Sequence, residues 1–286
     1  MVNFSDQSKG IIITACAVLI ISPDTLIVRL LDLDHWTLLF WRGLLVSAGM
    51  MISLAFFYRA RTFQQFRKIG NSGLLLIILF TASTLFFVIA LTYTSVANTL
   101  VIIATAPIFA VILSRIILAE KISIFTAITI VIVLASISLI VSESYQGGTL
   151  AGDLCAMGTA ICIAGSFVTT RRSRHINMIP AIALSSALTA TIAFLAADSI
   201  YINTGQFNLL VILGLILTIG MGLLIIGPRY IPAPQVSLLM PLETVFGTFL
   251  VWIIIGEPLS NTTIMGGLII IIFLTLHSYH SITNAR

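Results

Sequence analysis

Three charged side chains lie inside long apolar stretches of this sequence, and each has the chemistry to bind or move a charged group. Asp24 lies in the first stretch, Arg42 in the second and Glu243 in the ninth. An ionised side chain within hydrocarbon costs about 2.5–3.5 kcal/mol on insertion scales, so each needs a partner or a function. A guanidinium binds carboxylates or phosphates through its planar fork, whereas a carboxylate takes up a proton or binds an ammonium group.

Helical rise places Asp24 and Arg42 at similar depths, about 10 Å and about 9 Å below one membrane face, which favours an ion pair. Arg42 therefore has two interpretations: it clamps an anionic group of a substrate, or it cancels the charge of Asp24. Both hold if substrate competes with Asp24. Glu243 lies about 16 Å into its helix, near the midplane. It is either a proton carrier or substrate contact, or a hydrogen-bonded acid that joins two helices.

Three prolines interrupt apolar stretches that are otherwise long enough to be single helices: Pro23, Pro107 and Pro241. Proline removes a backbone donor and kinks a helix, and the carbonyl set free is tolerated at membrane depth where it lines a cavity or finds another donor. These positions are candidate hinges, with fixed packing bends as the alternative.

Other polar and aromatic residues are candidates for the same site or for gates at its two ends. Trp41 is a candidate wall residue, and Asn98 and Gln235 can hydrogen-bond either a substrate or neighbouring helices. Glu120 and Glu257 end helices, where each is a gate residue or a cap. Since a carboxylate opposes the dipole of a helix carboxyl end, Glu120 needs a cation, and Lys121 or Arg115 is nearest in sequence. The helix-end tyrosines Tyr93 and Tyr230 are gate candidates or interfacial anchors.

The elements that carry these residues must be membrane helices. The chain has 286 residues, 59% of them hydrophobic and 8% charged, with a mean hydropathy of +1.15. Its apolar runs approach the roughly 20 residues that cross a bilayer. The sequence predicts ten spans: 11–31, 36–57, 71–91, 95–117, 122–142, 150–171, 178–198, 209–227, 232–255 and 262–281. The segments 59–68 and 142–148 are predicted loops, and the first run is expected to be a retained span rather than a cleaved signal.

Basic residues indicate how these spans are oriented. Of the 14 lysines and arginines, most belong to the two termini and to the connections after spans 2, 4, 6 and 8. They are Lys9, Arg59, Arg61, Arg67, Lys68, Arg115, Lys121, Arg171, Arg172, Arg174, Arg229 and Arg286. Under the positive-inside rule both termini are cytoplasmic.

The two halves of the chain resemble each other at a constant offset of 137 positions, which relates Tyr93 to Tyr230 and Glu120 to Glu257. The predicted repeats are 1–146 and 147–286, with five helices each. Because five is odd, the second half crosses the membrane in the opposite sense. Inverted repeats of membrane helices are typical of secondary transporters, which bind substrate between the halves. The prolines break the symmetry, because Pro107 shifted by 137 falls one helical turn beyond Pro241.

The chain resembles the EamA-like family of the drug/metabolite transporter superfamily. The resemblance rests on Trp41-Arg42-Gly43, on Pro107 followed by Ala119-Glu120, and on the stretch from Pro241 to Gly256-Glu257-Pro258, with Gly266-Gly267 in the last span. It implies ten helices around a central cavity and the export or exchange of small metabolites, often amino acids or related compounds.

We therefore expect a multi-pass protein of the inner plasma membrane that exports a small polar metabolite by alternating access. Import or exchange of a compound such as S-adenosylmethionine is the alternative, and a non-transporting membrane partner or a membrane enzyme is the other class. Protons are the coupling ion considered. No phosphate-binding loop, metal-ligand set or catalytic triad is visible, so no cofactor, metal or nucleic acid is expected. A monomer and a homodimer both remain open.

Overall fold

The structure is a computed structural model that describes residues 6–94, 96–141, 149–256 and 261–283, and every secondary-structure element there is helical. Nine of these helices are long and apolar enough to cross a membrane, and the shorter apolar helix Ile124–Ile140 makes the tenth. The crossing segments are α1 (Asp6–Ile21) with α2 (Asp24–Leu31), α3 (His35–Tyr58), α5 (Gly70–Tyr93), α6 (Val96–Ile103) with α7 (Ala106–Leu113) and η2 (Ser114–Leu118), α8 (Ile124–Val141), α9 (Leu150–Arg172), α10 (Ile179–Ala196), α11 (Thr204–Leu224), α12 (Ala233–Leu239) with α13 (Pro241–Ile255), and α14 (Asn261–Thr283).

The ten predicted spans are confirmed, and most of their ends agree within about three residues. The exceptions are the first span, predicted to begin at residue 11 although α1 begins at Asp6, and the eighth span, predicted to begin at residue 209 although α11 begins at Thr204. Asn203 accepts a hydrogen bond from the backbone of Gln206, whose side chain accepts one from the backbone of Asn203. This capping box satisfies two helix-end donors and starts the helix early.

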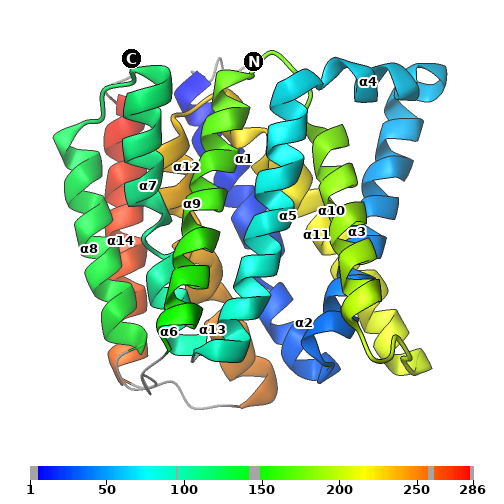
Figure 1. Ribbon diagram of the computed structural model, residues 1–286. Helices are drawn as coiled ribbons and strands as arrows, with labels where there is room; N and C mark the ends of the chain where they lie inside the picture. The colour runs from blue at the N-terminus through cyan, green and yellow to red at the C-terminus, as the bar shows by residue number, and fades with distance from the viewer. Residues whose placement is uncertain (1–5, 95, 142–148, 257–260, 284–286) are drawn as a thin grey trace.

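The predicted loop 59–68 is wrong in detail, because it folds into the short helices η1 (Arg59–Arg61) and α4 (Thr62–Lys68). Phe63 is 69% exposed, and the guanidinium of Arg67 lies 5.3 Å from the centre of its ring. A segment with aromatic and basic side chains on the surface is suited to lie at the edge of a bilayer. The start of α1 and the end of α14, which are nearest to the two termini, lie at the same end of the bundle as α4 (Figure 1).

Helix pairing follows the symmetry that inverted repeats require. The third span packs on the sixth (α5 on α9). In the other repeat the third span corresponds to the eighth and the sixth to the first, and these also pack together (α11 on α1). Two further pairs join equivalent spans directly, α3 with α10 and α8 with α14. In Figure 1, α8 and α14 form one side of the bundle, while α3, α10 and α11 lie on the other. The protein is thus an all-α membrane protein of two interlocked five-helix repeats.

Close approach of two backbones sets the pairing of α3 with α10. A methyl group at Gly43 would lie 2.7 Å from the carbonyl oxygen of Ser186 and 3.0 Å from the amide nitrogen of Ala190. Small residues let membrane helices pack at such distances. Since Gly43 follows Arg42, this crossing also places the backbone of Arg42 close to α10.

Candidate functional site

The predicted ion pair between Asp24 and Arg42 is present. Arg42 Nη2 lies 2.6 Å from Asp24 Oδ2, and the two side chains are 27% and 10% exposed, respectively. The other carboxylate oxygen, Asp24 Oδ1, is buried, and no hydrogen-bond partner is found for it among the described residues. The pair therefore neutralises the charge of Asp24 but leaves one acceptor of the carboxylate without a donor.

Glu243 belongs to the same cluster. Its carboxyl group interacts electrostatically with both Asp24 and Arg42. The helices that carry the two acids pack closely, because a methyl group at Gly247 of α13 would lie 3.1 Å from the carbonyl oxygen of Ser22, just before α2. Asp24 and Arg42 come from the first repeat and Glu243 from the second, so the cluster lies between the repeats.

Breaks in two helices place the acids there. Pro23 precedes α2, whose first turn contains Asp24, and Pro241 begins α13, whose first turn contains Glu243. Proline fits the start of a helix because the donor that it lacks would have no partner there. Each acid thus lies at the positive end of a helix dipole within a span, which favours negative charge.

The predicted helix interruptions are observed at all three prolines, although their role as hinges stays a proposal. Pro107 lies in the first turn of α7, after a break at residues 104–105 between α6 and α7. Shifted by 137, that break falls at 241–242, next to the break between α12 and α13. The fourth span of each repeat therefore breaks at nearly the same place, although the prolines of the two spans are offset. The sixth span, α9, is continuous, unlike its equivalent, the first span.

Three of the other candidates make contacts within the protein. Trp41 Nε1 donates to the carbonyl of Ile200 at 3.1 Å. Asn98 Nδ2 donates to Thr94 Oγ1 at 2.9 Å and to Asp153, and the amide groups of Gln7 and Gln235 join at 2.7 Å. Asn98 and Gln235 each contact the first helix of the other repeat, as expected if they hydrogen-bond a neighbouring helix. A contact with substrate stays a prediction for Trp41, Asn98 and Gln235.

Glu120 does not use the predicted cations. Its Oε1 accepts a hydrogen bond from Arg171 Nε at 2.9 Å rather than from Lys121 or Arg115. Arg171 Nη1 also donates to the carbonyl oxygens of Pro228 and Arg229, at 3.4 and 3.3 Å. Sequence reasoning missed Arg171 because its partners are 51 or more positions away. The only signal for it was the cluster of basic residues after the sixth span.

The helix-end tyrosines occupy equivalent places. Gly152 lies against Tyr93, where a methyl group would be 2.9 Å from the tyrosine's carbonyl carbon, and Gly10 lies against Tyr230, with 2.8 Å to its Cβ. The carbonyl of Tyr93 accepts a hydrogen bond from Thr149 at 2.8 Å. These contacts again join each repeat to the first helix of the other. The fourth gate candidate, Glu257, lies outside the described residues.

Comparison with known proteins supports the two-repeat fold. The family model of the EamA-like transporter family matches residues 8–142 and 150–279, one match for each repeat. The chain belongs to the EamA-like transporter family. The crystal structure of another protein superimposes on this chain with a TM-score of 0.82 at 18% sequence identity. The match covers 96% of this chain and 98% of the other. No curated protein matches the chain.

As an EamA-like protein, the chain is a multi-pass membrane transporter. The structural match, at its low sequence identity, shows the shared fold alone. Membership of the family therefore names the class of activity, while the charged cluster is the feature of this chain from which a substrate class can be argued.

Proposed function

We propose that this EamA-like transporter exports a small zwitterionic metabolite, such as an amino acid or a related compound, across the inner plasma membrane. The observation that carries the proposal is the cluster of Asp24, Arg42 and Glu243 between the repeats. A guanidinium next to two acids offers one group for a carboxylate and another for an ammonium. Substrate would bind Arg42 in competition with Asp24.

Alternating access would follow from rocking of one repeat, with boundaries at 1–146 and 147–286, against the other. The broken helices α1–α2, α6–α7 and α12–α13 supply bends at Pro23, Pro107 and Pro241. Their half-helices begin in the membrane interior, where irregular backbone is tolerated if it lines a polar site. Arg171 and Glu120 would close the end of the bundle that contains the termini.

Protons are the proposed coupling ion, with Glu243 as their carrier. In proteoliposomes that contain the full-length protein, a proton gradient should drive movement of a labelled amino acid. Glu243→Gln should abolish the gradient-driven flux, because the amide cannot take up or release a proton, while exchange without a gradient continues. Melting temperature and gel-filtration profile check that the variant is folded.

Normal gradient-driven flux through Glu243→Gln would exclude this carboxyl as the proton carrier. To find the substrate, the melting temperature of the detergent-solubilised protein can be screened against amino acids, nucleobases and their derivatives, because ligands stabilise the state that binds them. Accumulation of the labelled compound in intact cells that contain the protein, instead of its loss, would contradict outward transport.

A further inference from the structure

A cavity of about 670 Å³ has residues of α4 in its wall and none of Asp24, Arg42 and Glu243. Figure 1 shows α4 at one end of the bundle. The walls of the cavity come from the end of α3, from α4, from the connection between α9 and α10, and from η4 (Gly227–Arg229). Both repeats therefore contribute. The volume is in the range of cavities that bind small molecules.

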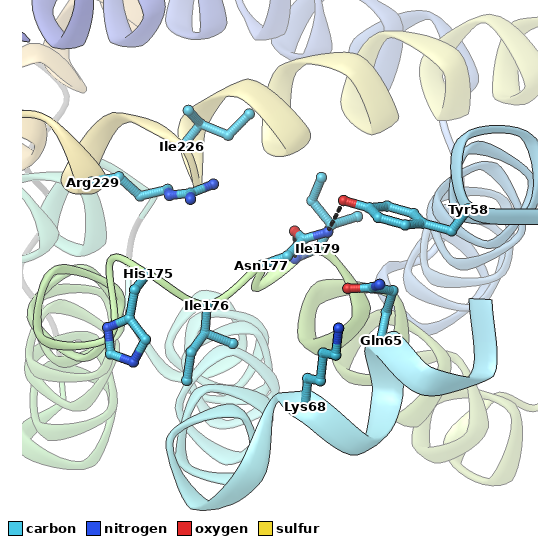
Figure 2. Close-up of a pocket in the computed structure, with 9 residues that line it drawn as sticks. All are labelled: Tyr58, Gln65, Lys68, His175, Ile176, Asn177, Ile179, Ile226 and Arg229. Atoms are coloured by element: carbon cyan, nitrogen blue, oxygen red, sulfur yellow. Dashed lines mark hydrogen bonds between the residues drawn. The ribbon is translucent and has the colours of Figure 1, made fainter. Parts of the chain in front are cut away.

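Cations face this cavity without carboxylates. In Figure 2 the side chains of Lys68 and Arg229 point toward the central space from different sides, and His175 also lines the cavity. Arg229 Nε donates to the carbonyl of Arg174 at 2.7 Å, which holds the guanidinium in place. Among the described residues, no acidic side chain lines the cavity, and neither Lys68 nor Arg229 forms an ion pair.

The described acids elsewhere at this end, Asp6 and Glu120, are already paired. Asp6 lies 3.7 Å from Lys9, and Glu120 is bound to Arg171. The cations of the cavity therefore repel one another without local compensation, an arrangement that an anion would relieve.

Neutral hydrogen-bonding groups complete the wall. Asn177 Nδ2 donates to the hydroxyl oxygen of Tyr58 at 3.1 Å, and Gln65 lies nearby (Figure 2). The hydroxyl proton of Tyr58 remains available for a ligand, since its oxygen serves as the acceptor in that bond. Two cations and several donors without an acid make up a typical site for a phosphate group.

The surroundings place the cavity at the edge of the bilayer. Phe56 and Phe57, next to Tyr58 in α3, are each 77% exposed, and Phe63 of α4 is 69% exposed. Apolar side chains that are this exposed are suited to contact lipid, and the basic groups beside them lie at the level of lipid headgroups. Basic pockets at the cytoplasmic side of membrane proteins bind anionic headgroups.

We propose that this cavity binds a phosphate group between Lys68 and Arg229, carried by an anionic phospholipid or by a soluble phosphate. The site is separate from the proposed transport site and does not depend on its substrate.

The test measures the melting temperature of the full-length protein in neutral detergent. The added probes are short-chain phosphatidylglycerol, short-chain phosphatidylcholine as the lipid without net charge, and inorganic phosphate against chloride at constant ionic strength. The variant Lys68→Gln/Arg229→Gln removes both cations. The matched control, Lys121→Gln/Arg172→Gln, removes the same charge from exposed positions at the same end.

Phosphatidylglycerol should stabilise the natural protein and the control at similar concentrations, and Lys68→Gln/Arg229→Gln should need about tenfold more of it or fail to respond. Stabilisation by phosphatidylglycerol but not by phosphate identifies a lipid headgroup, and stabilisation by inorganic phosphate identifies a soluble ligand. If Lys68→Gln/Arg229→Gln does not fold, three further variants replace it. Lys68→Arg/Arg229→Lys keeps both charges and should bind the probe as the natural protein does. The single variants Lys68→Gln and Arg229→Gln should each bind the probe more weakly. The proposal is overturned if no probe stabilises the natural protein. It is also overturned if Lys68→Gln/Arg229→Gln and the control Lys121→Gln/Arg172→Gln lose the response equally.

Discussion

At the scale of single residues, the question is whether Arg42 serves the fold, the substrate or both. Its 2.6 Å bond to Asp24 shows the structural role directly. Removing one partner of a buried pair leaves a charge without compensation, whereas removing both is often tolerated. The two roles can therefore be separated with a pair of substitutions.

Arg42→Ala alone should lower the free energy of unfolding by about 3 kcal/mol, because it leaves Asp24 charged and buried. Arg42→Ala/Asp24→Ala should recover most of that loss. Denaturant titration in detergent measures both, and transport assays follow on the stable double variant. If Arg42 also clamps substrate, the double variant stays stable but does not transport; full transport by it would leave Arg42 with the structural role alone.

At the scale of helices, glycines decide which pairs approach closely. Gly43 lies against the backbone of α10, so a neighbour cannot move aside by changing a side-chain rotamer. Gly222 of α11 is the useful contrast, because a methyl group there would lie 3.7 Å from the end of the Met50 side chain, an ordinary contact.

Gly43→Ala should destabilise the protein by about 1–3 kcal/mol, since α3 and α10 must separate to admit the methyl group. Gly222→Ala should be neutral or slightly stabilising, because alanine favours a helix more than glycine does. Unfolding in denaturant compares the two. Equal effects of both substitutions would mean that the α3–α10 crossing is not limited by backbone contact.

At the scale of the whole molecule, Arg171 joins three segments from both repeats at the end that carries the termini. It binds Glu120 after the fourth span and the carbonyls of Pro228 and Arg229 between the eighth and ninth spans. Opening this end must break these bonds. In a protein with two states, their loss shifts the population toward the open one.

Arg171→Ala should raise the exposure of this end. With Ser114→Cys, at a buried position of η2, as the reporter in a background without the natural cysteines, labelling by a water-soluble maleimide should become at least about fivefold faster. Membrane fragments that expose both faces suit the measurement. Arg172→Ala, the exposed neighbour on α9, should leave the rate unchanged. A rate that is insensitive to Arg171→Ala would show that the ion pair does not hold a gate closed.

The ten spans and the two repeats can be predicted from the amino-acid sequence alone, because the length of an apolar run is a local property, whereas the depths of Asp24, Arg42 and Glu243 in the membrane stay predictions. Sequence reasoning missed the helix α4 and the early start of α11, where capping and interfacial patterns are short. The pairing of Glu120 with Arg171, the bonds by which Asn98 and Gln235 join the repeats, and the meeting of Lys68 with Arg229 at one cavity became visible only in the folded protein. Those contacts depend on which helices become neighbours, and packing between distant segments, rather than any nearby sequence, sets that arrangement.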